Sequence, residues 1–349
     1  MRLRGRVTPK RSAAGPAAVA SGIRQALCID PAAASESIAA RLRQIVADEL
    51  RARGAVVAMS GGVDSSVCAG LAVKALGPER VLGLILPERD SSDRDLVLAE
   101  QWAIELGIEA ITENISPILE AAGCYRRRDE AIRRVVPDFG AGWQCKVGYG
   151  GGPAGGAKLN VWYLTTRSPD GQTQRVRLTP EAYRGIVAAT NFKQRVRKML
   201  EYYHADRLRY AVVGTPNRLE YDQGFFVKNG DGSADLKPIA HLYKSQVYQL
   251  AAYLGIPSEI RQRPPTTDTY SLQQSQQEFY FALPYAEMDV CLYGRNHGVP
   301  AAGVAEAVGL SAEAVERVYN MIDAKRNATR YLHRPPLLVE KVAEVEASG

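Results

Sequence analysis

The chain has 349 residues, of which 46% are hydrophobic and 23% are charged, so it holds enough apolar side chains for a full core. Its longest apolar run, residues 81–87, has only the length of a strand, which argues against a membrane-spanning helix. A formal net charge of +6 favours anionic partners without separating nucleotides from nucleic acids. The five cysteines are scattered and form no C-x-x-C pair, so we expect reduced thiols, no zinc site and a cytoplasmic location.

The first 24 residues are basic and lack acidic side chains and hydrophobic periodicity, which predicts a disordered basic tail over 1–24. A transit peptide shares this composition, but the many Pro and Gly residues and the missing amphipathic stripe favour the tail. From residue 35 to residue 50 apolar side chains recur at helical spacing. This pattern predicts a helix ahead of the first strand.

Strand and helix patterns then alternate along the chain. The predicted strands cover residues 55–59, 81–86, 109–112 and, after a long interval, 210–215. The predicted helices that separate the first three strands cover residues 65–75 and 96–106. Such alternation predicts an α/β fold with a doubly wound, mostly parallel sheet and flanking helices. Ligands of these sheets bind beyond the carboxyl ends of the strands, so the loops there are expected to share one crevice.

The sequence Ser-Gly-Gly-Val-Asp-Ser-Ser at residues 60–66 lies at the first of these strand ends. Adjacent glycines can turn backbone N–H groups toward one point, and the first turn of the next helix adds its unpaired N–H groups and positive dipole end. This predicts a pyrophosphate cradle. The loop lacks a phosphate-binding Lys, and Asp64 would repel phosphate without a cation, so we expect Mg²⁺, shared with Glu220 after the strand over 210–215. From the residues alone, a helix-capping turn and a solvated Glu220 remain alternatives.

Further motifs follow in a fixed order. They are N-F-K-Q-R-V-R at 191–197, N-G-D-G-S-A-D at 229–235, L-Y-K-S-Q-V at 242–247, P-P-T-T-D at 264–268 and Y-A-E-M-D at 285–289. Together with the loop at 60–66 they resemble the NAD synthetase family, ammonia-dependent members of the N-type ATP pyrophosphatases. The resemblance covers about residues 26–123 and 189–336.

The resemblance implies an adenine nucleotide α-hydrolase-like fold and a ligase that forms a C–N bond. ATP would adenylate the carboxylate of nicotinic acid adenine dinucleotide and release pyrophosphate, and ammonia would then displace AMP to give NAD. Negative charge develops on the pyrophosphate as it leaves, so a site for this reaction needs hydrogen-bond donors and a cation that stabilise this charge. Family members also form homodimers, so a homodimer is expected here.

The family's functional positions map onto residues of this chain. By resemblance, ATP and pyrophosphate are bound by Ser60, Gly61, Gly62, Asp64, Ser65, Ser66, Thr215 and Lys244. Asp64 and Lys244 are the implied catalytic residues, and Asp64 and Glu220 the implied Mg²⁺ ligands. The implied dinucleotide-binding residues are Asn191, Arg195, Lys228, Asp231 and Asp235. Taken singly, Lys244 and Arg195 are typical of solvated helix faces, and Asn229-Gly230 is typical of a turn. None of the four histidines shows metal-site or triad spacing.

The chain departs from the family pattern in a long insertion at about 124–189. It contains a basic helix-like run at 125–135, a glycine-rich loop at 148–156 and a β-hairpin formed by 160–165 and 173–178. The insertion could be a lid, a dimer contact, a docking site for an ammonia-supplying amidotransferase or a passive surface elaboration. We expect a single domain over 25–336 and a C-terminal tail over 337–349.

Two other functions remain open from the sequence. Val227 and Asn229 replace the Thr and Tyr of the family's Thr-Lys-Tyr-Gly-Asp-Gly loop, so a divergent paralogue that amidates a different carboxylate is the second hypothesis. An RNA-directed protein that uses the arginines of 126–134 is the third. The lack of paired cysteines argues against it, and nucleic acid is not expected as a partner.

Overall fold

A computed structural model describes residues 16–149, 161–264, 270–272 and 283–342. Its central sheet has four parallel strands in the order β3-β2-β1-β7. The strands are β1 (Ala55–Ala58), β2 (Val81–Ile85), β3 (Glu109–Thr112) and β7 (Ala211–Val213). Val56 of β1 pairs with Leu82 on one side and with Val212 on the other. The four predicted strands and their parallel pairing are confirmed.

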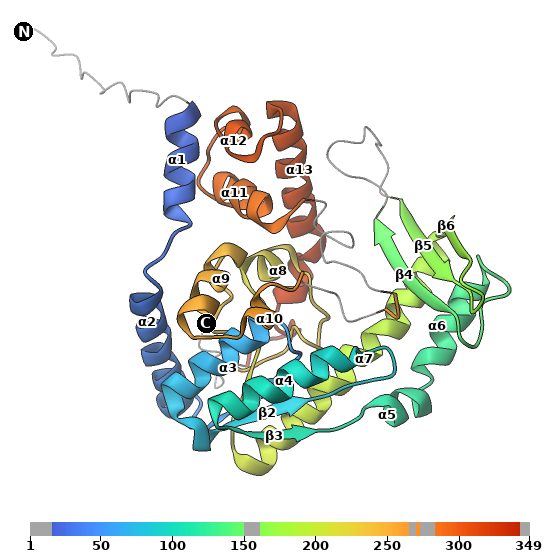
Figure 1. Ribbon diagram of the computed structural model, residues 1–349, viewed down its shortest axis with the longest axis horizontal. Coiled ribbons are helices and arrows are strands. Elements are labelled where there is room, and N and C mark those ends of the chain that lie inside the picture. Colours follow the sequence, from blue (N-terminus) through green and yellow to red (C-terminus); the bar gives the residue numbers. More distant parts are fainter. Residues whose placement is uncertain (1–15, 150–160, 265–269, 273–282, 343–349) are drawn as a thin grey trace, which may run out of the picture.

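Helices cover both faces of this sheet, because the alternating side chains of β1 enter two different cores. Ala55 and Val57 belong to a core shared with α2 (Pro31–Gln44), α3 (Val63–Leu76), α4 (Asp93–Leu106) and α9 (Lys244–Tyr253). Val56 belongs to a core shared with α5 (Ser116–Ala121), α6 (Cys124–Arg133) and α7 (Pro180–Leu208). The predicted doubly wound α/β fold is therefore confirmed (Figure 1).

A separate group of helices stands beyond the sheet. It consists of α11 (Tyr285–Asn296), α12 (Ala301–Val308) and α13 (Ala312–Thr329), and α1 (Pro16–Ala26) from the other end of the chain packs against α12 and α11 (Figure 1). Ala20, Ile23 and Leu27 are buried in this core. The predicted disordered tail over 1–24 is therefore wrong for residues 16–24, and residues 1–15 lie outside the described part of the chain.

The insertion forms a small layer of its own. Strands β4 (Gln144–Tyr149), β5 (Trp162–Arg167) and β6 (Thr173–Arg177) make a three-stranded antiparallel sheet in that order. The predicted hairpin is confirmed as β5 and β6, whereas β4 was not predicted. The backbone N–H of Cys145 in β4 donates to Ser271 Oγ at 2.9 Å, and the N–H of Leu272 donates to the Cys145 carbonyl oxygen at 3.1 Å. The insertion thus holds a short segment of the C-terminal half.

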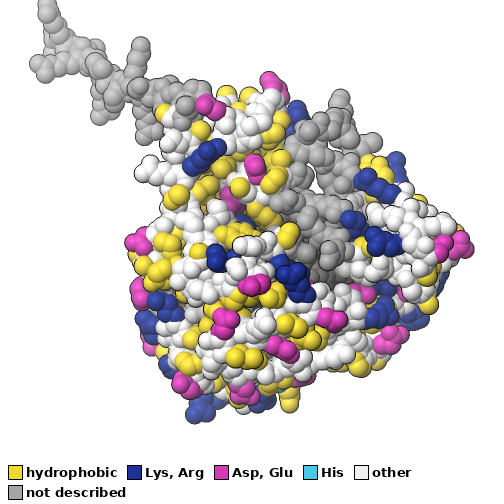
Figure 2. Space-filling view, viewed as in Figure 1, with side chains coloured by type: hydrophobic (Ala, Val, Ile, Leu, Met, Phe, Trp, Pro, Cys, Tyr) yellow, Lys and Arg dark blue, Asp and Glu magenta, His cyan; other side chains and the backbone are white. Residues whose placement is uncertain are grey.

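Several Lys and Arg side chains lie on the surface of the insertion (Figure 2). The arginines of the run at 125–135 do not all face solvent. Arg128 is 5% exposed and its guanidinium contacts Asp90 at 2.9 Å and Asp129 at 2.7 Å. Arg133 donates to the carbonyl oxygen of Phe139 at 2.8 Å. Arg128 is therefore used inside the fold, whereas Arg126, Arg127, Arg133 and Arg134 are exposed, with Arg126 paired to Glu130 at 2.9 Å.

The remaining elements are short. They are η1 (Ile45–Glu49), η2 (Pro78–Arg80), α8 (Arg218–Gln223), α10 (Ser258–Arg261) and η4 (Arg330–His333). Residues 337–342 of the predicted C-terminal tail form no helix or strand, and 343–349 lie outside the described residues. Within the described ranges, every helix is too short or too polar to cross a bilayer.

Candidate active site

The loop after β1 folds tightly against the start of α4. Gly61 has φ +73°, the left-handed region that favours glycine, and a Cβ built on it would come within 2.4 Å of the Asp95 carbonyl oxygen. The hydroxyls of Ser65 and Ser66 donate to the Gly62 carbonyl oxygen at 3.0 and 2.9 Å. These contacts fix the first turn of α3, so its free N–H groups and dipole face the cavity described below.

Asp64, in that first turn, is held from two sides. The buried ammonium of Lys244, the first residue of α9, forms an ion pair with Asp64 Oδ2. Asn217 Nδ2 donates to Asp64 Oδ1 at 3.1 Å. Asn217 also caps α8, because its Oδ1 accepts from the Glu220 N–H at 3.2 Å while Glu220 Oε2 accepts from the Asn217 N–H at 3.1 Å. One amide side chain therefore links the two predicted metal ligands.

The electrostatics of this group disfavour a second negative charge beside Asp64. Burial, reinforced by the charge of Asp64, raises the pKa of Glu220 to about 8. Burial opposes the charge of Lys244, but Asp64 and Glu220 outweigh that effect and raise the pKa of its ammonium. The one buried ammonium thus balances the charge of Asp64, and a further cation would favour the ionised form of Glu220.

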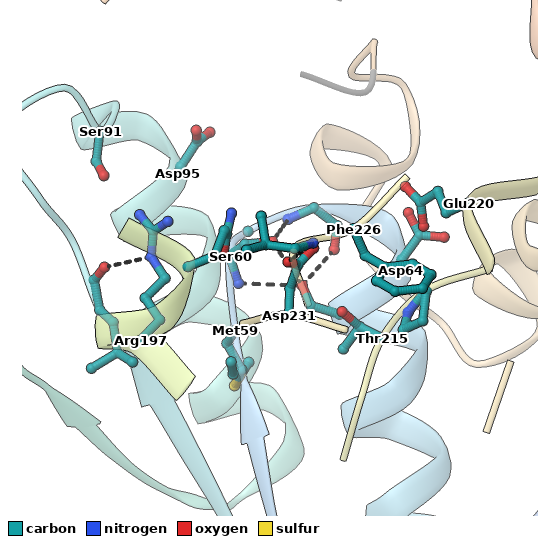
Figure 3. A pocket seen from close by; sticks show the side chains of 18 of the residues that line it. Met59, Ser60, Asp64, Ser91, Asp95, Arg197, Thr215, Glu220, Phe226 and Asp231 are labelled. Atoms are coloured by element: carbon teal, nitrogen blue, oxygen red, sulfur yellow. Dashed lines mark hydrogen bonds between the residues drawn. The ribbon is translucent and has the colours of Figure 1, made fainter. Parts of the chain in front are cut away.

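The residues present fit Mg²⁺. Among the described residues no group of three or more His, Cys, Asp or Glu side chains could hold a metal by itself. Mg²⁺ is commonly bound by one or two carboxylates together with water and substrate phosphate oxygens. Asp64 and Glu220 supply such a pair beside a loop suited to phosphate, and they lie at the same end of the cavity (Figure 3).

The cavity has a volume of about 440 Å³ and opens beyond the carboxyl ends of β1, β2 and β7. Nine of the predicted site residues line it: Ser60, Gly61, Gly62, Asp64, Ser65, Asn191, Thr215, Glu220 and Asp231. Asp231 is held by its own loop, since its Oδ1 accepts from the Val227 N–H at 2.8 Å. The three strand-end loops thus meet as the sequence predicted.

The other predicted site residues lie off the cavity wall. Ser66 is buried behind its loop, and Lys244 lies behind Asp64. Arg195 is exposed and donates to the Lys228 carbonyl oxygen at 3.4 Å, while Lys228 Nζ donates to the Tyr331 carbonyl oxygen at 3.2 Å. Asp235 instead accepts from the Val212 N–H at 2.7 Å. A dinucleotide contact by Arg195, Lys228 or Asp235 therefore stays a prediction.

Apart from Asn191, sequence reasoning missed one long wall of the cavity, the face of α7. The lining residues recur at steps of three and four, which is the spacing of one helix face: Tyr183, Val187, Thr190, Asn191, Gln194, Arg197, Lys198 and Glu201. Arg197 Nε donates to the Leu86 carbonyl oxygen beyond β2 at 3.2 Å (Figure 3), and Lys198 and Glu201 form a buried ion pair at 2.6 Å. The sequence alone shows that these residues share one face of a helix, but it does not reveal whether that face lines a cavity or packs in a core.

The model of the NAD synthase family matches residues 34–135 and 172–331. The chain belongs to the NAD synthase family. Within that family, an NH(3)-dependent NAD(+) synthetase from Mesorhizobium japonicum is 58% identical over 91% of this chain and 99% of its own length. One from Thermotoga maritima is 39% identical over 69% of this chain and 80% of its own length. The predicted family membership is confirmed.

Two solved structures share the fold of this chain. An NMN synthetase from Francisella tularensis superposes with a TM-score of 0.62 at 25% identity and covers 89% of this chain and 99% of its own. An NH3-dependent NAD synthetase from Campylobacter jejuni gives 0.58 at 20% identity, with coverages of 89% and 100%. The second likeness supports the fold alone.

The family match also delimits the insertion. The stretch that the NAD synthase model passes over, residues 136–171, contains β4 and β5. The flanking parts of the predicted insertion at about 124–189, with α6 and the start of α7, fall inside the matched ranges. The part of the chain that lies outside the family pattern is therefore narrower than the sequence predicted.

Proposed function

We infer that this protein is an ammonia-dependent NAD synthetase, a ligase that uses ATP to convert nicotinic acid adenine dinucleotide into NAD, AMP and pyrophosphate. The observation that carries this inference is the position of Asp64, beside Glu220 and Lys244, in a glycine loop that opens a helix at the carboxyl edge of the sheet. In a member of the NAD synthase family, this is the geometry that nucleotidyl transfer requires.

The two steps follow from the chemistry of the site. A carboxylate oxygen of the substrate attacks the α-phosphorus of ATP, and the bond to pyrophosphate breaks with its electron pair going to the leaving group. The N–H groups around Gly61 and Gly62 and the dipole of α3 stabilise that pyrophosphate. Ammonia then attacks the acyl carbon, AMP departs with the bonding electrons, and the nitrogen loses a proton. Lys244 holds Asp64 in place throughout.

We also propose Asp64 and Glu220 as the residues that hold Mg²⁺. The ion would supply positive charge against the phosphate oxygens of ATP. Thr215, which follows β7 and lines the cavity, is proposed to contact ATP, and Asn191 and Asp231 to contact the dinucleotide. Their places on the cavity wall support these roles.

The experiment measures NAD, AMP and pyrophosphate after incubation with ATP, Mg²⁺ and ammonium, with and without nicotinic acid adenine dinucleotide. We expect all three products only when the dinucleotide is present, with the NAD identified by mass. Glutamine should not replace ammonium in the isolated chain. A folded protein that binds ATP but forms no NAD would favour the paralogue that amidates another carboxylate.

Replacing Glu220 with Gln is expected to stabilise the protein more at pH 8 than at pH 5, measured without Mg²⁺. Folding raises the pKa of Glu220 from 4.5 to about 8. Between these two pH values the folded wild type therefore keeps the proton on the Glu220 carboxyl, whereas the unfolded chain releases it. Its stability therefore falls as pH rises from 4.5 to about 8, by at most about 1.4 kcal/mol per pH unit. At pH 5 Glu220 is already neutral, like Gln.

Urea unfolding at pH 5, 6.5 and 8 measures this difference. The control is Glu105→Gln, an exposed glutamate of α4, which should show the same small effect at every pH. If Glu220→Gln changes the free energy of unfolding by the same amount at all three pH values, the raised pKa of Glu220 is contradicted.

We propose three further properties on the strength of the family resemblance: a homodimer, a cytoplasmic location, and ammonia taken either free or from an amidotransferase partner. Size-exclusion chromatography with light scattering tests the first. A stable monomer with full activity would contradict it.

A further inference from the structure

Two aromatic rings from different parts of the chain form one end of the cavity. Trp162 of β5 and Tyr183 of α7 stack with ring centroids 4.7 Å apart and planes inclined by 20°, and both line the cavity. Tyr183 lies in a range that the family model matches, whereas Trp162 lies in the stretch at 136–171 that the model passes over. The insertion therefore contributes directly to the wall of the site.

The core of the insertion fixes the orientation of this pair. Both rings are half-buried against a cluster that includes Leu164 and Ile186, and Tyr270, which also lines the cavity, belongs to the same cluster. Burial raises the pKa of Tyr183 to about 12, so its phenol is neutral at physiological pH. A neutral aromatic surface with fixed rings is suited to a planar, uncharged heteroaromatic ring.

The pair lies far from the reacting centre. Tyr183 and Arg197 are 14 residues apart on the cavity face of α7, which corresponds to about 21 Å of helix. Arg197 donates a hydrogen bond to the Leu86 carbonyl oxygen, just beyond the carboxyl end of β2. Strand β2 lies next to β1, which leads into the glycine loop. Between them Thr190, Asn191 and Gln194 continue the wall. The cavity thus joins a phosphate-binding end to an aromatic end.

We propose that Trp162 and Tyr183 form the stacking surface for the adenine ring of the dinucleotide substrate. This inference rests on the proposed function. The carboxylate of the substrate must reach the α-phosphorus beside the glycine loop, so its pyridine ring lies at the phosphate end. The second ring of the dinucleotide, on the far side of its own pyrophosphate, then extends along α7 toward the aromatic end.

The test is steady-state kinetics of Trp162→Ala and Trp162→Phe. Loss of one base-stacking contact should raise the KM for nicotinic acid adenine dinucleotide by about 5-fold to 100-fold in Trp162→Ala. The KM for ATP and the kcat should stay near the wild-type values, and Trp162→Phe should recover most of the loss. With nicotinic acid mononucleotide, which lacks adenine, Trp162→Ala should behave like the wild type.

A matched control is Trp143→Ala. Trp143 belongs to the same insertion and packs on Phe139, with ring centroids 5.7 Å apart, but it is not among the residues that line the cavity. It should leave the KM for the dinucleotide unchanged. If it raises that KM as much as Trp162→Ala does, the effect comes from loosening of the insertion and the proposal is overturned. A rise in the KM for ATP instead of that for the dinucleotide would assign the aromatic end to the adenine of ATP and also overturn it.

Calorimetric binding of adenosine diphosphate ribose separates this proposal from the proposed function. This ligand carries the adenine but no nicotinate, so its binding does not require turnover. Weaker binding to Trp162→Ala than to wild type and Trp143→Ala supports the stacking surface even if no NAD is formed. Equal binding to all three proteins rejects it even if the enzyme is active.

Discussion

Replacing Asp64 with Asn is expected to lower kcat for NAD formation by about 1000-fold while the protein stays folded. The amide keeps the size of the side chain, but its single oxygen can accept from only one of Lys244 and Asn217, and it removes the negative charge that faces Glu220 and the cavity. The measurement is pyrophosphate release and NAD formation at several Mg²⁺ concentrations, with thermal unfolding recorded in parallel. Turnover near the wild-type rate would contradict the role of Asp64.

The same substitution leaves the buried Lys244 without its ionic partner, so a loss of stability must be separated from a loss of catalysis. The double variant Asp64→Asn, Lys244→Met removes both charges and should regain part of any stability lost by Asp64→Asn alone. It should remain inactive. Asp48→Asn, an exposed aspartate of η1, is the control for the chemical change and should be fully active.

Replacing Gly61 with Ala is expected to cost about 1–3 kcal/mol of stability and to lower kcat/KM by about 100-fold. At φ +73° a Cβ is strained by itself, and here it would come within 2.4 Å of the Asp95 carbonyl oxygen, which is backbone and cannot turn away. The loop must shift, and a displacement of about 1 Å in a reacting geometry can cost about 100-fold in rate.

The neighbouring glycine provides the matched control. Gly62 has φ −92°, and the atom nearest to a Cβ built there is Ser60 Oγ at 3.3 Å, the end of a rotatable side chain. The free energy of unfolding of Gly62→Ala should therefore stay within about 0.5 kcal/mol of the wild type. Urea unfolding of both variants measures the difference. Equal stability of the two would show that the loop does not depend on the left-handed residue.

The sheet and the phosphate end of the site were readable from local patterns. A strand followed by two glycines and a helix dictates its own geometry, so the positions of Ser60, Gly62 and Asp64 follow from neighbours in the sequence. Thr215 and Glu220 reach the same cavity because parallel strands end at one edge.

What the sequence could not provide depends on contacts between distant residues. Small apolar side chains such as Ala20 and Ile23 form a weak stripe, and α1 becomes a stable helix through a core made almost entirely of residues beyond 283. Trp162 gave no signal as a site residue, because nothing local tells an aromatic residue in a strand whether its ring meets a core or a cavity. Arg195 matched a motif, yet its side chain is directed to the surface.

The packing of α1 against α12 and α11 also has a consequence for synthesis on the ribosome. The segment that carries Ala20, Ile23 and Leu27 is translated well before the helices that bury these side chains, which begin at Tyr285. At about 5–20 residues per second, its apolar face waits tens of seconds before its partners exist. The helices over 285–329 therefore complete a core whose α1 segment has been exposed since its own translation, and we expect this segment to need chaperone protection during that interval.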